Sequence, residues 1–183
     1  KVPLVPTFTF QANLADFGAA IGSDESLREV FRAEITESVG TLRAAFDAGV
    51  PLLTGSESGF SLTPYGDWHY RELQVFVEDL GMTPLQAINS ATEQGARALK
   101  LEGELGCIKP DYLADILVFD GEPETHVTQL GDADRFRHII KNGRLVDSST
   151  PLPKEWQLPG WRVSEYSERI LTKELVQSMG LNP

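Results

Sequence analysis

The stretch that most constrains the fold is residues 49–59, which read GVPLLTGSESG. It opens with a short apolar run, residues 50–54, and continues as small and polar residues around one carboxylate, Glu57. A long amphipathic helix pattern precedes the run, and two further helix patterns follow it. A buried strand between helices, with polar residues just past its C-terminal end, is how α/β folds build active sites. We therefore predict an α/β chain with its chemistry centred on Glu57.

A long helix is predicted over residues 23–49. Ser23 or Ser26 is the expected N-cap, and Gly49 is the expected C-terminal cap. Apolar residues recur at three- and four-residue steps, so we expect one face of this helix to be buried. These residues are Leu27, Val30, Phe31, Ile35, Val39, Leu42 and Phe46.

Two shorter helices are predicted after the apolar run. The first covers residues 70–80. The second runs to Leu99 and has a clear start. Thr83 can cap it, Pro84 suits its first turn, and Gln86 is placed for a capping box.

Short β-runs and loops account for much of the remaining pattern. Residues 2–7 read as a strand by their β-branched content, and residues 8–22 read as a loop. Residues 115–120 predict another strand. Residues 137–146 predict a hairpin, because the Asn142-Gly143 pair suits a type I′ turn.

The composition is that of an ordinary soluble globular protein, with 41% hydrophobic and 23% charged residues among 183. The net charge of −11 argues against nucleic acid or an anionic membrane surface as a partner. No apolar run approaches the roughly 20 residues that a membrane-spanning helix needs. Cys107 is the single cysteine, which rules out an internal disulfide and fits a reducing compartment such as the cytoplasm.

The order of predicted elements is strand, helix, strand, helix, helix and then a small antiparallel β-unit. It matches the closing segments of a (β/α)₈ TIM barrel, which needs about 250 residues in full. We assign residues 1–102 to that barrel, residues 103–147 to an accessory β-domain, and residues 148–183 to an extended tail with a short helix near residues 171–178. Two strands cannot close a barrel, and a self-standing module would have open sheet edges. Because the chain also starts at Lys1 within an apolar run, we expect it to be the C-terminal portion of a longer polypeptide.

Glu57 is the leading candidate for chemistry. At the C-terminal end of a parallel strand its carboxylate would point into the barrel mouth, where it could bind a metal or take a proton from a metal-bound water. The alternative is that Glu57 belongs to a solvated turn. His69 could contact substrate, orient Glu57 or hydrogen-bond a neighbouring loop. The three histidines form no ligand motif, so this chain does not carry a complete metal site. A serine hydrolase elbow is discounted, because Glu57 stands where Gly-x-Ser-x-Gly requires serine.

Four stretches of the chain resemble the amidohydrolase superfamily, in its imidazolonepropionase-like and prolidase-like branch. Residues 49–59 resemble the eighth barrel strand of that family, which usually ends Gly-Thr-Asp-Ser-Gly. The last barrel helices are matched by residues 69–73 (HYREL) and 81–88 (GMTPLQAI). Residues 103–118 resemble the return into a small accessory β-sandwich domain, and residues 139–146 (IIKNGRLV) resemble its closing hairpin. The order and spacing of the four stretches carry the assignment.

The resemblance implies a metal-dependent hydrolase of C–N bonds in amides, cyclic amides, carbamates or dipeptides. Glu57 would bind the metal and shuttle the proton, with one or two divalent ions, zinc above all, held by ligands from earlier strands. His69, Tyr65 and Trp68 are the residues that we expect to contact the small-molecule substrate. The missing strands imply a partner, the N-terminal barrel portion on the same or a separate chain, and we expect a homo-oligomer.

Glu57 departs from the family pattern, because Asp usually occupies this position. The extra methylene moves the carboxylate by roughly one C–C bond, and a misplacement near 1 Å can cost about 10²-fold in rate. Either the metal site is rearranged or activity is reduced or lost. The alternative to an enzyme is a non-catalytic scaffold or binding subunit. Asp111-Tyr112 also replaces the usual Gly-Lys, in a turn of the β-domain.

Overall fold

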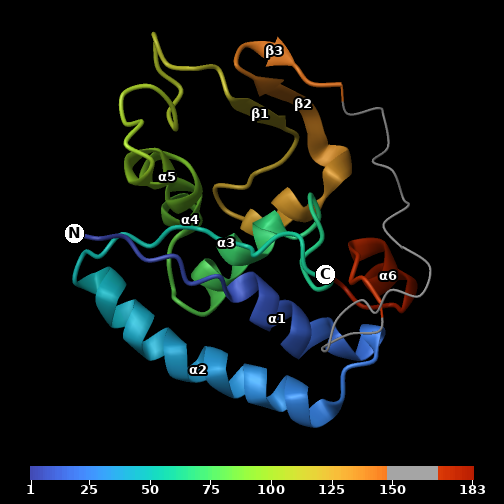
Figure 1. Cartoon of the computed structure of the whole chain (residues 1–183). Coiled ribbons are helices and arrows are strands. Elements are labelled where there is room, and N and C mark those ends of the chain that lie inside the picture. The colour runs from blue at the N-terminus through green and yellow to red at the C-terminus, as the bar shows by residue number, and fades with distance from the viewer. Residues whose placement is uncertain (148–168) are drawn as a thin grey trace.

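The computed structural model describes residues 1–147 and 169–183 as an α/β chain (Figure 1). Its helices are, in chain order, α1 (Phe8–Phe17), η1 (Gly18–Ile21), α2 (Glu25–Asp47), α3 (His69–Glu78), α4 (Pro84–Ala91), α5 (Glu93–Ala98), η2 (Val127–Gly131), η3 (Ala133–Arg135) and α6 (Lys173–Ser178), the η elements being short 3-10 helices. One antiparallel sheet contains β1 (Ile116–Phe119), β2 (Phe136–Lys141) and β3 (Arg144–Leu145). Figure 1 shows this sheet at the opposite end of the molecule from α2, with α1 and α3 between them.

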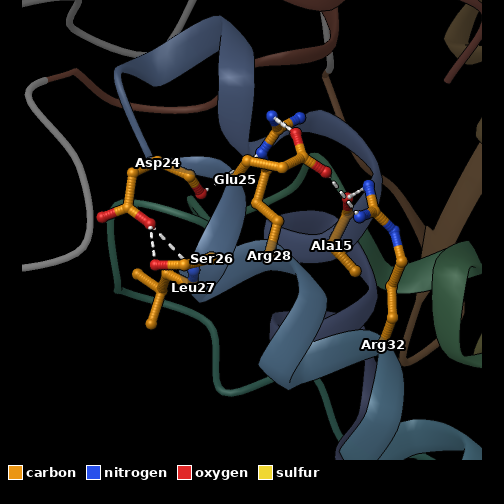
Figure 2. A network of polar contacts seen from close by, with 7 residues as sticks. All are labelled: Ala15, Asp24, Glu25, Ser26, Leu27, Arg28 and Arg32. Carbon is orange, nitrogen blue, oxygen red and sulfur yellow. Dashed lines mark hydrogen bonds and ion pairs between the residues drawn. The ribbon is translucent and has the colours of Figure 1, made fainter.

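Asp24 caps the start of α2, in place of either predicted serine. Its Oδ1 accepts hydrogen bonds from the Leu27 amide at 2.8 Å and from the Ser26 hydroxyl at 2.7 Å (Figure 2). The Leu27 amide holds the pKa of Asp24 below its usual value. Further along the helix, Arg32 donates to the carbonyl oxygen of Ala15 at 2.6 Å. The cap therefore fixes where α2 begins, and Arg32 fastens this end of α2 to α1.

The apolar stripe of α2 is half-buried, because α2 is an outer layer packed on one side only. Val30 is 51% exposed, contrary to its predicted place on the buried face. No residue of α2 is fully buried. The other predicted stripe residues pack against the core beneath them: Leu27, Phe31, Ile35, Val39, Leu42 and Phe46.

Two hydrophobic clusters form the core. The Phe76 cluster joins the N-terminal end of α1 to α3 and includes Phe8, Leu52, Leu73, Phe76 and Leu80. The Trp68 cluster joins the other end of α1 to the C-terminal segment and includes Leu14, Ile21, Leu62, Trp68, Leu171 and Val176. Burial of apolar surface contributes about 25 cal/mol per Å² and is the dominant favourable term in folding. The two clusters therefore bind segments that are far apart in the sequence into one body.

α1 replaces the loop that the sequence predicts over residues 8–22. The helical residues 8–17 contain neither glycine nor proline. Most of them are buried, so α1 lacks the one-sided apolar stripe by which a surface helix is recognised. Its stability comes from tertiary packing, which a periodicity argument does not see.

The two predicted strands on either side of α2 lie side by side in parallel orientation. They form a single bridge, between Leu4 and Leu52. The Leu4 amide donates to the Pro51 carbonyl at 3.0 Å, and the Leu53 amide donates to the Leu4 carbonyl at 2.8 Å. Prolines in both segments lack the N–H that a longer ladder requires. The segments are therefore adjacent and parallel, but the strands predicted over residues 2–7 and 50–54 are reduced to this one bridge.

The capping box at the start of α4 is confirmed. The Gln86 amide donates to Thr83 Oγ1 at 3.3 Å, and the Thr83 amide donates to Gln86 Oε1 at 2.8 Å. The single helix predicted to continue to Leu99 is wrong, because the backbone breaks at Thr92. The Thr92 hydroxyl donates to the Ile88 carbonyl at 2.8 Å, and such side-chain bonds compete with the helix.

The predicted hairpin is confirmed by β2 and β3. Asn142 has a φ of 49° and Gly143 a φ of 74°, the two positive values that a type I′ turn requires. β1 pairs antiparallel with β2 and completes the sheet. Leu117 on β1 and Leu145 on β3 remain exposed, so the sheet presents apolar side chains at its surface.

The predicted extended tail falls largely on residues 148–168, which lie outside the described residues. The short helix predicted near residues 171–178 is confirmed as α6. Thr172 caps it, because its Oγ1 accepts a hydrogen bond from the Leu175 amide at 3.1 Å. Across the two described ranges, no helix is both long enough and apolar enough to cross a membrane.

Candidate functional site

The segment that leads to Glu57 runs directly against the segment that leads into α1. A Cβ atom on Gly55 would lie 2.5 Å from Val5 Cγ1 and 2.7 Å from Thr7 Cγ2. Only glycine fits such a close approach. Thr7 has a φ of 57°, a left-handed conformation, immediately before α1 begins. The two parallel segments therefore stay in close contact up to Gly55 and Thr7. Glu57 follows two residues after Gly55.

Glu57 is exposed and has a φ of 48°, which is also left-handed. Its carbonyl oxygen accepts a hydrogen bond from the Thr63 hydroxyl at 2.7 Å. The Gly59 amide donates to the Thr63 carbonyl at 2.9 Å, so the loop closes on itself. Within residues 1–147 and 169–183, nothing bonds to the Glu57 carboxylate. The backbone of Glu57 is fixed, while its carboxylate is available to a ligand.

His69 opens α3 and lies beside the loop that carries Glu57. Its Nδ1 is 3.3 Å from the Ser56 hydroxyl oxygen, which is also 2.6 Å from the Ser58 hydroxyl oxygen. Of the three roles that the sequence left open for His69, the structure shows a hydrogen bond to a neighbouring loop. A substrate contact by His69 stays a prediction.

A cavity of about 270 Å³ lies between the end of this segment, α3 and the β-sheet. Its polar lining residues include Thr54, Ser56, His69 and Glu72. Its apolar lining residues include Leu73, Leu117, Leu130 and Phe136. Glu57, Tyr65 and Trp68 lie outside this lining. The structure thus brings His69 to the cavity, whereas the other three predicted site residues are not part of its lining.

Glu72 is a second carboxyl group in this region, and it is not among the predicted site residues. It is 0% exposed, and its Oε2 accepts hydrogen bonds from the Thr9 amide at 2.8 Å and the Thr9 hydroxyl at 2.9 Å. Its Oε1 is buried without a partner in the described chain. Burial raises the pKa of Glu72 to about 7, although the hydrogen bonds from Thr9 oppose this rise. Glu72 therefore holds the first turn of α1 against α3, and it titrates near neutral pH.

One sequence signal could have found Glu72. It precedes Phe76 by four residues, and residues four apart lie on the same helix face. Leu73, Phe76, Val77 and Leu80 recur at helical spacing, so a carboxyl group at residue 72 is placed beside an apolar helix face. A charged residue in such a position is either paired or shifted in pKa.

Tyr65 and Trp68 have different surroundings. Tyr65 is 58% exposed, with its hydroxyl near the Cα of Gly59, since a Cβ atom added to Gly59 would lie 3.0 Å from it. Trp68 is buried between the rings of Phe17 and Tyr70, and its Nε1 donates to the Leu171 carbonyl at 2.8 Å. Substrate contacts by both residues stay predictions, and the contacts that the structure gives Trp68 are those of a core residue.

The residues that the structure describes do not fit a metal ion by themselves. Zinc sites in enzymes use about three protein ligands drawn from His, Cys, Asp and Glu. The two described ranges contain no group of three such residues that could hold a metal. Near the end of the parallel segment the described residues offer the Glu57 carboxylate and the His69 ring, so further ligands would have to come from outside the two described ranges.

Three comparisons with known proteins bear on this site. An imidazolonepropionase from Rhodococcus jostii is 31% identical over 107 residues, which are 58% of this chain and 26% of that protein. The crystal structure of a prolidase complexed with N-methylphosphonate-L-proline matches with a TM-score of 0.61 and 27% identity, over 79% of this chain and 34% of that one. The crystal structure of Aspergillus niger ochratoxinase matches with a TM-score of 0.59 and 27% identity, over 77% of this chain and 31% of that one.

These relatives are all much longer than the matching region, and the chain spans less than half of each. The solved relatives are amidohydrolase barrel proteins, which agrees with the α/β class that the sequence predicts. Residues 15–146, most of the chain, match the amidohydrolase family. The chain therefore belongs to the amidohydrolase family.

Proposed function

We propose that this chain is the part of an amidohydrolase that supplies the carboxylate at the end of the eighth barrel strand, Glu57. The proposed reaction is hydrolysis of a C–N bond in a small amide, cyclic amide, carbamate or dipeptide. The observation that carries the proposal is the place of Glu57. It is an exposed carboxylate, without a partner in the described chain, that follows one of two parallel segments. Family membership over residues 15–146 supports the reaction class.

A divalent metal ion, zinc above all, is the proposed cofactor, with one or two ions in the site. Such an ion polarises a carbonyl group and lowers the pKa of a bound water to about 7. Carboxylate oxygen is an ordinary zinc ligand, so Glu57 is suited to hold the ion. As a metal ligand, this chain contributes the Glu57 carboxylate, held by the loop over residues 55–63.

The proposed partner is the N-terminal barrel portion, on the same or a separate polypeptide. In the described residues the two parallel segments share a single bridge, and a parallel pair of this kind has open edges with which further strands can pair. The exposed Leu117 and Leu145 of the sheet also indicate a surface that another part of the protein covers. A cytoplasmic location, which the single cysteine supports, and a homo-oligomeric state complete the proposal.

The rival proposal is a non-catalytic amidohydrolase-like scaffold or binding subunit. The observation that favours it is the identity of residue 57, which is Glu where the family pattern has Asp. The longer side chain changes the position of the carboxylate, and a small displacement of a reacting group lowers the reaction rate strongly.

A hydrolysis assay tests the two proposals against each other. It uses the barrel-complete protein, which is this chain together with the N-terminal barrel portion. The zinc-loaded protein is assayed on N-acyl amino acids, Xaa-Pro dipeptides and cyclic amides. We expect turnover of at least one class, loss of turnover on zinc chelation, and a fall of about 10²-fold or more in Glu57→Ala. Glu29→Ala is the control, because Glu29 is an exposed carboxylate on α2. Absence of turnover throughout would favour the scaffold, whereas full activity in Glu57→Ala would contradict the proposed role of Glu57.

A further inference from the structure

Glu57 is held in a backbone conformation that residues other than glycine rarely adopt. Its φ of 48° lies in the left-handed region. Such a residue keeps this conformation only where its surroundings fix it, and cases of this kind cluster at functional sites. Glu lacks the short amide or carboxylate that lets Asn and Asp tolerate this region. The contacts that fix Glu57 must therefore be sought in its neighbours.

Thr63 makes the contact that holds the backbone of Glu57. The residue is 0% exposed, and its hydroxyl donates to the Glu57 carbonyl at 2.7 Å. Its amide donates to the Phe60 carbonyl at 3.1 Å, and its carbonyl accepts from the Gly59 amide at 2.9 Å. Every polar group of Thr63 is thus engaged with residues 57–60, and the hydroxyl is the one that reaches Glu57.

Asn13 anchors this loop to α1. It is 0% exposed, and its Nδ2 donates to the carbonyl of Leu62, the residue before Thr63, at 2.8 Å. Leu62 is itself 0% exposed, in the Trp68 cluster. One turn earlier on α1, Thr9 is held by Glu72. A line of buried polar contacts therefore runs from α3 through α1 to the loop that carries Glu57.

We propose that Thr63 is a positioning residue for Glu57. Its hydroxyl fixes the left-handed turn at Glu57, and with it the direction in which the carboxylate leaves the backbone, while Asn13 keeps Thr63 in place. The inference deepens the proposed function and rests on it for the role of the carboxylate, but the backbone contact itself is independent of any activity.

The place of this contact suits a ligand residue. A hydrogen bond to the carbonyl of Glu57 leaves both carboxylate oxygens available, whereas a bond to the carboxylate would occupy a lone pair that a ligand needs. Residues that orient a metal ligand without touching the ion typically change metal affinity by 10–100-fold when they are mutated. Thr63 therefore affects metal binding only through its hydrogen bond to Glu57.

Amide hydrogen exchange over residues 57–63 of the full chain is the first test. Thr63→Val has nearly the same shape but lacks the donor, so we expect exchange in this segment to rise about tenfold, the usual worth of one hydrogen bond. Thr63→Ser restores the donor and should return exchange to within about threefold of the wild type. Ser90→Ala is the matched control, because Ser90 is also buried and its hydroxyl donates to a backbone carbonyl, that of Gln86, at 3.2 Å. Unchanged exchange in Thr63→Val would overturn the proposal.

A double-mutant cycle on Zn²⁺ affinity is the second test, made on the barrel-complete protein. We expect Thr63→Val to weaken Zn²⁺ binding by about 10–100-fold in the wild-type background. It should cause no further loss in the Glu57→Ala background, because its effect passes through Glu57. An equal loss in both backgrounds would overturn the positioning role. A wild-type protein that binds no Zn²⁺ would contradict the proposed function, and the exchange measurement would then decide the backbone contact alone.

Discussion

Glu57 and Glu72 are held in opposite ways. Glu57 is exposed, and its backbone is fixed by Thr63 while its carboxylate has no partner in the described chain. Glu72 is 0% exposed, and its carboxyl group is bound through Oε2 to the amide and hydroxyl of Thr9. The first arrangement leaves a charge available to a ligand, and the second uses the carboxyl group to join two helices.

The difference shows why burial alone does not identify the residue that does chemistry. Burial raises the pKa of Glu72 to about 7, and a shifted pKa in a cavity is often read as a sign of function. Here the hydrogen bonds from Thr9 give Glu72 a structural role, because they attach the first turn of α1 to α3. Glu57 instead lies exposed after the end of a parallel segment, where we propose that it binds a metal ion. We expect variants of the two residues to separate stability from metal binding.

The largest expected effect on stability comes from removing Glu72. Glu72→Ala leaves the Thr9 amide and hydroxyl buried without a partner and opens a cavity, so we expect a loss of about 4 kcal/mol in the free energy of unfolding. Glu57→Ala should change it by no more than about 0.5 kcal/mol, because the side chain is exposed. Urea unfolding at pH 5 measures both. Equal losses in the two variants would break the comparison.

The pH dependence of stability should also separate the two carboxyl groups. The pKa of Glu72 rises from an ordinary 4.5 to about 7 on folding. Between these values the unfolded chain has released the proton while the folded chain retains it, so stability falls as pH rises through this window. The fall contributed by Glu72 is about 3 kcal/mol in all. Urea midpoints are measured between pH 4.5 and 7.5. This fall in stability with rising pH should be absent in Glu72→Gln and present in Glu57→Gln. A profile unchanged by Glu72→Gln would contradict the raised pKa.

A smaller effect tests the left-handed conformation of Glu57. A β-branched residue is strained at positive φ, whereas glycine is not, so Glu57→Val should be less stable than Glu57→Gly by about 1 kcal/mol. At the helical residue Glu29 the order should be reversed, because glycine is the poorer helix former. Thermal unfolding of the four variants gives both differences. The same order at both positions would show that residue 57 is not held in this conformation.

Local signals predict parts of this fold well. The capping box of Thr83 and Gln86 and the turn at Asn142-Gly143 depend on a few neighbouring residues, and the structure confirms both. α1 could not be predicted in this way, because it is buried on most sides and has no clear period. The N-cap of α2 was wrongly predicted at one of two serines, because Asp24 between them is an N-cap residue of similar preference and is the one that accepts from the Leu27 amide.

The candidate site was predictable only where it is local. The sequence places Glu57 after an apolar run, and the structure keeps it exposed there. The contact between Gly55 and Thr7 joins residues that are far apart in the chain, so no local pattern reveals it. The same holds for the bond between Trp68 and Leu171, which makes Trp68 part of the core. Tertiary contacts thus decide which of the predicted residues face a cavity.

The most direct measurement is the zinc content of the barrel-complete protein by elemental analysis after extensive dialysis. The wild type is compared with Glu57→Ala and with the control Glu29→Ala, which removes an exposed carboxylate on α2. If Glu57 is a metal ligand, the wild type and the control retain one or two zinc ions per chain, and Glu57→Ala loses at least one of them. Equal zinc content in all three proteins would contradict a ligand role for Glu57, and the loop that holds Glu57 would then not be part of a metal site.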